Sequence, residues 1–299
     1  MTYIIENATI LKERKMTKTS LLIENGKILS IKPDYKRYRF IRMNAASFIM
    51  TPTSTLLHKE LPLDLPFQEL KAYFINEFIL KGCTTFITLA AVNQEQALSK
   101  EIKRVNTRLL NSPIDYIIGV KISSRLLTPS LLRKCKREKV PAIFVEINQV
   151  DELYSLPWGW LREAMFPYNS PLIPLFVNKN ERERNYALAE WKRMMEKEKI
   201  PAIHEEIAEN EPIPYSVLKK IGIFPKKSSI HQGLELSYNL YLKSREIRNI
   251  EEVELFHYYR HMLVHTVHKG EVIRAKDYID FRPGFGEHVK INTPSYFTI

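Results

Sequence analysis

The chain has 299 residues, of which 44% are hydrophobic and 26% charged, and this balance is typical of a globular protein and excludes a disordered or fibrous one. The formal net charge is +11, but the basic residues are dispersed and no zinc-finger or RNP pattern accompanies them, so we expect no nucleic-acid partner. The two cysteines, Cys83 and Cys135, form no C-x-x-C pair, which excludes a disulfide scaffold. The chain has no run of 18 apolar residues and begins without the features of a secretory signal, so we expect a cytoplasmic protein with no membrane segment.

Short β segments are expected over residues 3–50. Asn25-Gly26 separates two apolar runs, 20–23 and 28–31, and this pair favours a hairpin turn in which both central residues have positive φ. The last third of the chain returns to β character at 237–242, 262–267 and 271–279. No long polar linker separates these regions from the middle of the chain. We therefore expect the two ends, 1–50 and 213–299, to form one composite β-sandwich domain.

The middle of the chain, residues 51–212, has a different pattern. Apolar runs of strand length alternate with helix-like stretches, which predicts a parallel sheet or barrel. The expected strands are 84–90, 114–122, 142–147 and 172–177, and the expected helices are 67–81, 93–110, 128–139 and 181–198.

Several short sequence segments resemble those of a known superfamily. They are T-Y-I-I-E-N-A-T-I-L at 2–11, S-L-L-I-E-N-G-K-I-L-S-I at 20–31, F-I-M-T-P at 48–52, the segment 218–233, V-H-T-V-H-K-G-E-V-I at 264–273 and R-P-G-F-G-E-H-V at 282–289. In this order they resemble the amidohydrolase superfamily, and the last two most resemble its dihydropyrimidinase, hydantoinase and dihydroorotase branch. The resemblance implies a metal-dependent hydrolase of cyclic amides. It also implies a (β/α) barrel with its site at the C-terminal ends of the strands.

The metal ligands that this resemblance implies are largely missing. The family has a His-x-His pair after its first strand, and here His58 is kept while Glu60 takes the second position. Lys121, in G-V-K-I at 119–122, is the counterpart of the lysine that the family carboxylates to bridge two metal ions. Glu146 lies on a strand where the family has a ligand histidine. His204, followed by two glutamates, is either a displaced ligand or part of an exposed helix start.

The length of the middle segment is an independent argument. A complete eight-stranded barrel takes about 250 residues, whereas 51–212 accommodates about five or six strand-helix units. We therefore predict an α/β fold with a truncated TIM-like (β/α) barrel beside the small β-sandwich. The open edges of such a barrel need cover from a helix or from another subunit.

Three further features have both a functional and a structural interpretation. On one helix, four histidines would share a face and could bind a metal, but a strand over 264–268 favours packed or exposed side chains instead. These histidines are His257, His261, His265 and His268. The Trp158-Gly159-Trp160 cluster could form a binding lip, although core packing is the more frequent outcome. Cys83 has apolar neighbours and is expected in the core rather than as a nucleophile.

The sequence thus predicts a degenerate amidohydrolase, a pseudoenzyme with a binding, assembly or regulatory role and no cofactor. We expect a homo-oligomer or a protein partner, and no membrane. The alternative is an active hydrolase of cyclic amide C–N bonds with a rearranged site, in which zinc is bound by His58, Glu60, Lys121 and His204 beside Glu146. A third possibility, a basic module that recruits an anionic partner, rests on net charge alone.

Overall fold

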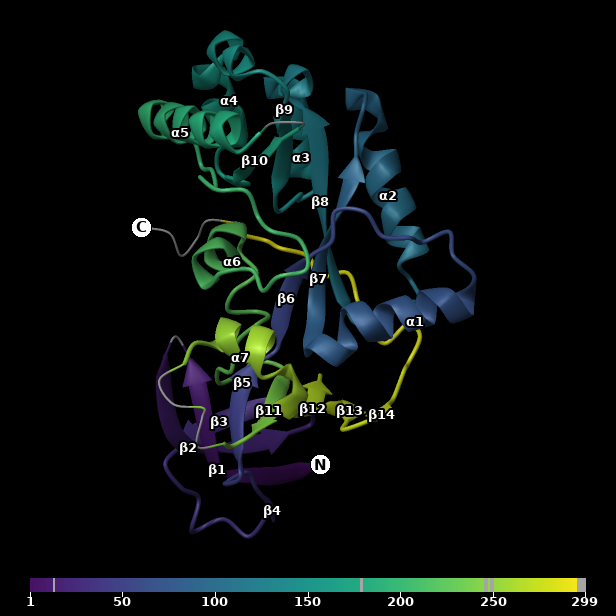
Figure 1. Cartoon of the computed structure of the whole chain (residues 1–299), viewed down its shortest axis with the longest axis vertical. Coiled ribbons are helices and arrows are strands. Elements are labelled where there is room, and N and C mark those ends of the chain that lie inside the picture. Colours follow the sequence, from purple (N-terminus) through teal and green to yellow (C-terminus); the bar gives the residue numbers. More distant parts are fainter. Residues whose placement is uncertain (13, 178–179, 245–246, 248–249, 295–299) are drawn as a thin grey trace. The chain divides into compact units, whose positions relative to one another are not determined.

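The computed structural model describes residues 1–12, 14–177, 180–244, 247 and 250–294 (Figure 1). The chain divides into two compact units. Unit 1 comprises Met1–Thr55, Asp64–Thr85 and Pro225–Phe285, and unit 2 comprises Leu56–Leu63, Phe86–Phe224 and Gly286–Ile299. Both units are therefore assembled from segments that are distant in the sequence.

Unit 1 contains a nine-stranded mixed sheet made by the two ends of the chain. Its strands are β1 (Thr2–Lys12), β2 (Lys15–Glu24), β3 (Lys27–Lys32), β4 (Ile41–Asn44), β5 (Phe48–Pro52), β11 (Tyr238–Leu242), β12 (Leu263–His268), β13 (Glu271–Ala275) and β14 (Tyr278–Ile279). They follow the order β14-β13-β12-β11-β5-β1-β2-β3, with β4 also paired to β1. N-terminal and C-terminal strands meet where β5 pairs with β11 in antiparallel register. The expectation that both ends of the chain contribute to one β structure is confirmed, as a single continuous sheet.

The hairpin predicted at Asn25-Gly26 joins β2 to β3. Both residues have positive φ, 49° and 71°, as the turn requires. A Cβ atom on Gly26 would lie 2.9 Å from the carbonyl oxygen of Lys269, so this close approach of two backbones also needs glycine. Ile23 pairs with Ile28 directly behind the turn, and both side chains are fully buried. Local turn chemistry and core packing therefore specify the same register.

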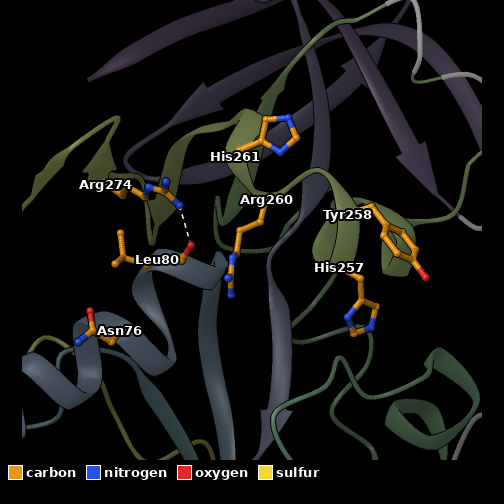
Figure 2. Close-up of a pocket in the computed structure, with 7 residues that line it drawn as sticks. All are labelled: Asn76, Leu80, His257, Tyr258, Arg260, His261 and Arg274. Atoms are coloured by element: carbon orange, nitrogen blue, oxygen red, sulfur yellow. Dashed lines mark hydrogen bonds between the residues drawn. The ribbon is translucent and has the colours of Figure 1, made fainter.

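Short helices accompany the sheet of unit 1. They are α1 (Phe67–Glu77), η1 (Ile79–Lys81), α7 (Glu252–Tyr258) and η5 (Arg260–Met262). Arg274 of β13 donates a hydrogen bond to the carbonyl oxygen of Leu80 at 2.7 Å, which ties the sheet to the end of η1 (Figure 2). Because α7 ends at Tyr258 and β12 begins at Leu263, the four histidines between 257 and 268 do not share one helix face.

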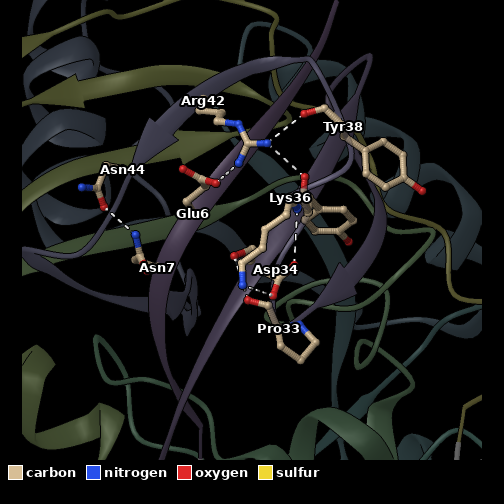
Figure 3. Close-up of polar contacts among 10 residues, drawn as sticks. Glu6, Asn7, Pro33, Asp34, Lys36, Tyr38, Arg42 and Asn44 are labelled. Atoms are coloured by element: carbon tan, nitrogen blue, oxygen red, sulfur yellow. Dashed lines mark hydrogen bonds and ion pairs between the residues drawn. The ribbon is translucent and has the colours of Figure 1, made fainter.

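The loop before β4 is held by the buried side chain of Tyr35, which packs with Ile4 and Leu22, and by polar contacts. Every residue of β4, Ile41–Asn44, is exposed. The guanidinium of Arg42 forms an ion pair with Glu6 of β1, and it donates to the carbonyl oxygens of Tyr35 at 3.0 Å and Tyr38 at 2.8 Å (Figure 3). One arginine thus fastens both the loop and its strand to the sheet.

Unit 2 contains a half-barrel of five parallel strands. They are β6 (Ser54–Leu57), β7 (Cys83–Ala91), β8 (Asp115–Ser123), β9 (Ile143–Ile147) and β10 (Leu172–Phe176), in the order β10-β9-β8-β7-β6. The helices are α2 (Leu98–Arg108), α3 (Pro129–Arg137), α4 (Trp158–Met165), α5 (Glu181–Glu198) and α6 (Tyr215–Ile221), with short 3-10 turns η2 (Glu95–Ala97), η3 (Ser124–Leu126) and η4 (Val150–Ser155). The incomplete TIM-like barrel predicted from the sequence is confirmed.

The two faces of the half-barrel have separate cores, because successive side chains of a strand point to opposite sides. On the outer face, residues such as Val120 and Val145 pack with helix residues such as Trp191. On the concave face, Ile117 and Phe144 pack with residues of α6. By the same alternation, the side chains of Glu146 on β9 and Lys121 on β8 also belong to the concave face.

The final segment of the chain, residues 286–291, runs beside the start of β8. The amide of Tyr116 donates to the carbonyl oxygen of Glu287 at 3.0 Å, and the amide of Val289 donates to that of Tyr116 at 2.8 Å. At Gly286 a Cβ atom would lie 1.9 Å from the carbonyl oxygen of Ile114. This approach is open only to glycine, so Gly286 fixes the point at which the segment meets the half-barrel.

A segment that we call the strap, residues 200–212, reaches both edges of the half-barrel. At β10, the amide of Ile203 donates to the carbonyl oxygen of Leu172 at 2.8 Å. At β6, the amide of Asn210 donates to the carbonyl oxygen of Leu57 at 3.1 Å. The edges are thus covered by a stretch of this chain's own irregular backbone, where the sequence predicted a helix or a second subunit.

The remaining motifs lie in the core or on the surface. Trp158 is buried, and its indole N–H donates to the carbonyl oxygen of Leu153 at 2.8 Å, whereas Trp160 is exposed. Cys83 and Cys135 are buried and free, and burial raises the pKa of the Cys135 thiol to about 12. Within the described part of the chain, no helix has the length and apolar character needed to cross a bilayer.

Candidate functional site

A polar cavity of about 490 Å³ lies in unit 2 where the half-barrel strands end. Seven of its lining residues are charged, three cations and four carboxylates: Lys59, Glu60, Lys121, Glu146, Arg184, Glu206 and Glu209. The others are the apolar residues at the end of β10, Leu175 to Val177. Sites of barrel enzymes lie at the C-terminal ends of the strands, so this cavity is the candidate functional site.

Lys121 is at the centre of the cavity's charge arrangement. It lies near the end of β8 on the concave face, and its Nζ is 3.3 Å from Oε1 of Glu60 and 3.5 Å from Oε1 of Glu146. Glu146 comes from the neighbouring strand β9, and Glu60 follows β6. The Lys121 and Glu146 side chains are 21% and 33% exposed, whereas Glu60 is 82% exposed. The structure therefore brings together three of the five candidate residues.

The remaining charges of the cavity are paired in the same way. Arg184 of α5 forms an ion pair with Glu206 of the strap, and the second oxygen of Glu206 accepts a hydrogen bond from the amide of Phe176 at 2.9 Å. Lys59 Nζ lies 3.6 Å from Oε2 of Glu209, whose other oxygen accepts from the Lys59 amide at 2.8 Å. Every carboxylate lining the cavity therefore has a cationic partner.

The two candidate histidines are not among the lining residues. His58 is buried, and its amide donates to the carbonyl oxygen of Ile87 at 2.8 Å. His58 follows the last residue of β6, and it is not among the described residues that line the cavity. His204 Nδ1 lies 4.0 Å from Oε1 of Glu196 on α5. Burial, together with the positive charge of Lys220, lowers the pKa of His204.

Sequence reasoning missed part of this site. Lys59 lies between His58 and Glu60 but has no counterpart in the family motif, and Glu206 appears in the sequence only as a neighbour of His204. Arg184 and Glu209 carry no local motif. Their role depends on where α5 and the strap pass the strand ends, which no spacing in the sequence indicates.

The side chains at this cavity do not fit the zinc centre that the fold implies. Catalytic zinc needs about three nitrogen or oxygen ligands that converge on one point. No histidine is found among the described residues that line the cavity, and its carboxylates already neutralise lysine or arginine. Carboxylation of Lys121 would replace its positive charge with a negative one beside Glu60 and Glu146, which repulsion opposes.

Comparisons with known proteins were made for sequence and for structure. No model of a protein family matches the chain, and no curated protein matches its sequence. Solved structures do match. A D-hydantoinase is 15% identical with a TM-score of 0.60, over 98% of this chain and 99% of that one. A dihydropyrimidinase from Brevibacillus agri is 12% identical with a TM-score of 0.63, over 98% and 99%.

An L-hydantoinase (dihydropyrimidinase) from Arthrobacter aurescens also matches, at 11% identity and a TM-score of 0.59, over 97% of this chain and all of that one. At such low identity the likeness concerns the fold. This chain therefore has the amidohydrolase fold of the hydantoinases and dihydropyrimidinases, and the resemblance drawn from its sequence is confirmed at the level of the fold.

Proposed function

We propose that this chain is a non-hydrolytic protein of the amidohydrolase fold, in which a network of ion pairs replaces the metal centre. Its role is then to bind or assemble, either with copies of itself or with another protein. The observation that carries the proposal is the position of Lys121 Nζ between Glu60 and Glu146, at 3.3 and 3.5 Å. A protonated amine in this position neutralises the two carboxylates and is no metal ligand.

The chemistry of amide hydrolysis supports this proposal. A bound metal ion polarises the carbonyl group and lowers the pKa of the attacking water to near 7. In this cavity, the residues that could substitute as a general base are carboxylates held by Lys59, Lys121 or Arg184. A carboxylate oxygen that accepts a hydrogen bond from lysine or arginine is engaged in that contact and is less free to accept a proton from water. The cavity is therefore poorly suited to activate water.

The filled concave face is a second support. Leu218 and Ile221 of α6 pack against Phe144 and Leu175 beneath the polar cavity. The same face is closed by the strap, whose Ile203 belongs to this core. A cyclic substrate would have to bind above this core, in contact with ion-paired side chains.

The first test is metal content and hydrolysis. The purified chain is incubated with zinc, dialysed, analysed by mass spectrometry for metal and for a carboxylated lysine, and assayed with hydantoin and dihydrouracil. We expect no retained zinc, an unmodified Lys121, and the same background rate for the chain and its Lys121→Met variant. Stoichiometric zinc together with hydrolysis that Lys121→Met or His58→Ala abolishes would establish the alternative, an active hydrolase with a rearranged site.

The second test concerns assembly. Light scattering over a range of protein concentrations measures the molar mass, and affinity capture measures partners of the full chain. We expect a mass above that of the 35.2 kDa monomer or a specific partner protein. A chain that stays monomeric and captures no partner would contradict an assembly role.

A further inference from the structure

A second cavity, of about 580 Å³, lies entirely within unit 1 (Figure 2). Two arginines and two histidines line it: Arg260, Arg274, His257 and His261. Its other described lining residues are Asn76, Leu80 and Tyr258, so no carboxylate is among them. This composition differs from that of the unit 2 cavity, in which four carboxylates accompany three cations.

Arg274 is fixed in place by the fold. It extends from β13, and its guanidinium donates to the carbonyl oxygen of Leu80 at 2.7 Å and to that of Lys276 at 3.2 Å. The side chain is half-buried. Because carbonyl oxygens rather than carboxylates hold it, the guanidinium keeps its full positive charge at the cavity wall.

Arg260 is available to a ligand. It is the first residue of η5 and is exposed, and its side chain makes no hydrogen bond or ion pair with any residue that the structure describes. Its side chain points the same way as that of His257, one turn earlier on α7 (Figure 2). An arginine without a partner offers its planar fork of N–H donors to a bound group.

Two acids near the cavity, on α1 and α7, are engaged by other groups, while the charge of Asp277, which follows β13, acts on Arg274. Glu77 at the end of α1 forms an ion pair with Lys81 at 2.6 Å. Glu254 of α7 accepts a hydrogen bond from the amide of Glu251 at 2.6 Å, as part of the helix cap. Neither carboxylate therefore neutralises the arginines of the cavity.

The two arginines also repel each other. Burial lowers the pKa of Arg274 most, and the charge of Arg260 lowers it further, while Tyr241 and Asp277 act in the opposite direction. An anion between the two guanidinium groups would relieve this repulsion. The cavity volume is within the range of about 300–1,000 Å³ for small-molecule sites, which leaves room for more than a lone inorganic ion.

We propose that this cavity binds a small molecule that carries a phosphate group. Arg260 provides bidentate hydrogen bonds, Arg274 adds a fixed positive charge, and His257 is a further donor. Guanidinium groups match phosphate oxygens in geometry, and a phosphate group has more acceptor oxygens and more negative charge for two arginines than a single carboxylate has. The inference is independent of the proposed function, because no residue of the unit 2 cavity contributes to it.

The test is calorimetric titration of the full chain with pyrophosphate and, separately, with inorganic phosphate. We expect saturable binding of pyrophosphate, and a loss of affinity of about tenfold or more in Arg260→Ala, because hydrogen bonds to charged groups contribute that much. Arg260→Lys keeps the charge but lacks the planar fork, so it should recover only part of the affinity.

A matched control distinguishes a specific binding site from nonspecific attraction by the protein's positive charge. Arg104 of α2 is an exposed arginine paired with Glu101 at 2.9 Å, and Arg104→Ala removes the same unit of charge. We expect its pyrophosphate affinity to equal that of the parent chain. Circular dichroism establishes that each variant is folded. The proposal is overturned if pyrophosphate shows no saturable binding, if Arg104→Ala weakens binding as much as Arg260→Ala, or if only RNA or anionic vesicles bind.

Discussion

Replacing Lys121 with methionine tests the ion-pair network in unit 2. Methionine keeps most of the aliphatic stem and removes the ammonium group that lies 3.3 Å from Glu60 and 3.5 Å from Glu146. The two carboxylates then lose their shared counter-ion. If the lysine is a structural cation, the free energy of unfolding must fall.

The expected loss follows from distance and exposure. A pair of unit charges 3.5 Å apart interacts by about 1 kcal/mol in water and about 5 kcal/mol at an effective dielectric constant of about 20. Glu60 is 82% exposed, so its interaction energy with Lys121 is close to the value in water. This pair contributes little to stability, because ordering the two side chains costs conformational entropy. Lys121 and Glu146 are 21% and 33% exposed, between a surface pair and a buried one. We expect Lys121→Met to lower the unfolding free energy by about 1–2 kcal/mol.

A double-mutant cycle measures the interaction energy between Lys121 and Glu146. Urea denaturation is carried out on the parent chain, Lys121→Met, Glu146→Gln and the double variant. We expect a coupling energy of about 1 kcal/mol. The same cycle on the helix pair Glu101–Arg104, 2.9 Å apart on α2 and with an exposed arginine, is the control and should give about 0.2–0.5 kcal/mol. The reasoning is refuted if Lys121→Met leaves stability unchanged, or if the coupling to Glu146 is no larger than that of the control pair.

Two further predictions concern the final segment of the chain. Gly286→Ala places a methyl group 1.9 Å from the Ile114 carbonyl oxygen, and urea denaturation should show that it destabilises unit 2 by about 1–3 kcal/mol or more. The control is Gly159→Ala in α4, where a Cβ atom would have no atom within 4 Å, and this variant should be neutral or stabilising. Equal effects of the two substitutions would contradict the close approach at Gly286. His288 is stacked on Tyr116 at 5.5 Å, and burial lowers its pKa, so the unfolded chain binds the proton first and stability is lost as the pH falls below about 6.5. His288→Phe keeps the stacked ring, so its loss of stability between about pH 7.5 and 5.5 should be smaller, and an unchanged loss would contradict the assignment.

The features that sequence could predict are those set by short-range rules. Asn25-Gly26 specifies its turn through positive φ at two adjacent residues, and the half-barrel strands follow from buried apolar runs of strand length. Lys121 is predicted because the segment G-V-K-I at 119–122 resembles the family's segment around its carboxylated lysine. Strand alternation then places Lys121 on the concave face. The length of the middle segment limits the barrel to about five or six strand-helix units, and it does not fix the number of strands.

The rest of the site depends on long-range placement. Glu209 reaches the cavity because the strap crosses to β6, and the strap has no hydrophobic period that would reveal its path. Register with a family motif predicts His58 as a ligand, but register alone does not indicate whether a side chain lines the cavity, and His58 is not among the described lining residues. Arg260 lies in a short 3-10 turn, and only the placement of its neighbours shows that no acid in the described ranges pairs with it.

The strap also bears on how a shortened barrel avoids aggregation. Open strand edges present rows of unpaired amide and carbonyl groups that invite stacking with other molecules. Here Pro201 and Pro212 lie near the two ends of the strap and have no amide hydrogen to offer an incoming strand. The chain thus terminates its own sheet at both margins, so fibril-like growth through this half-barrel has no starting point.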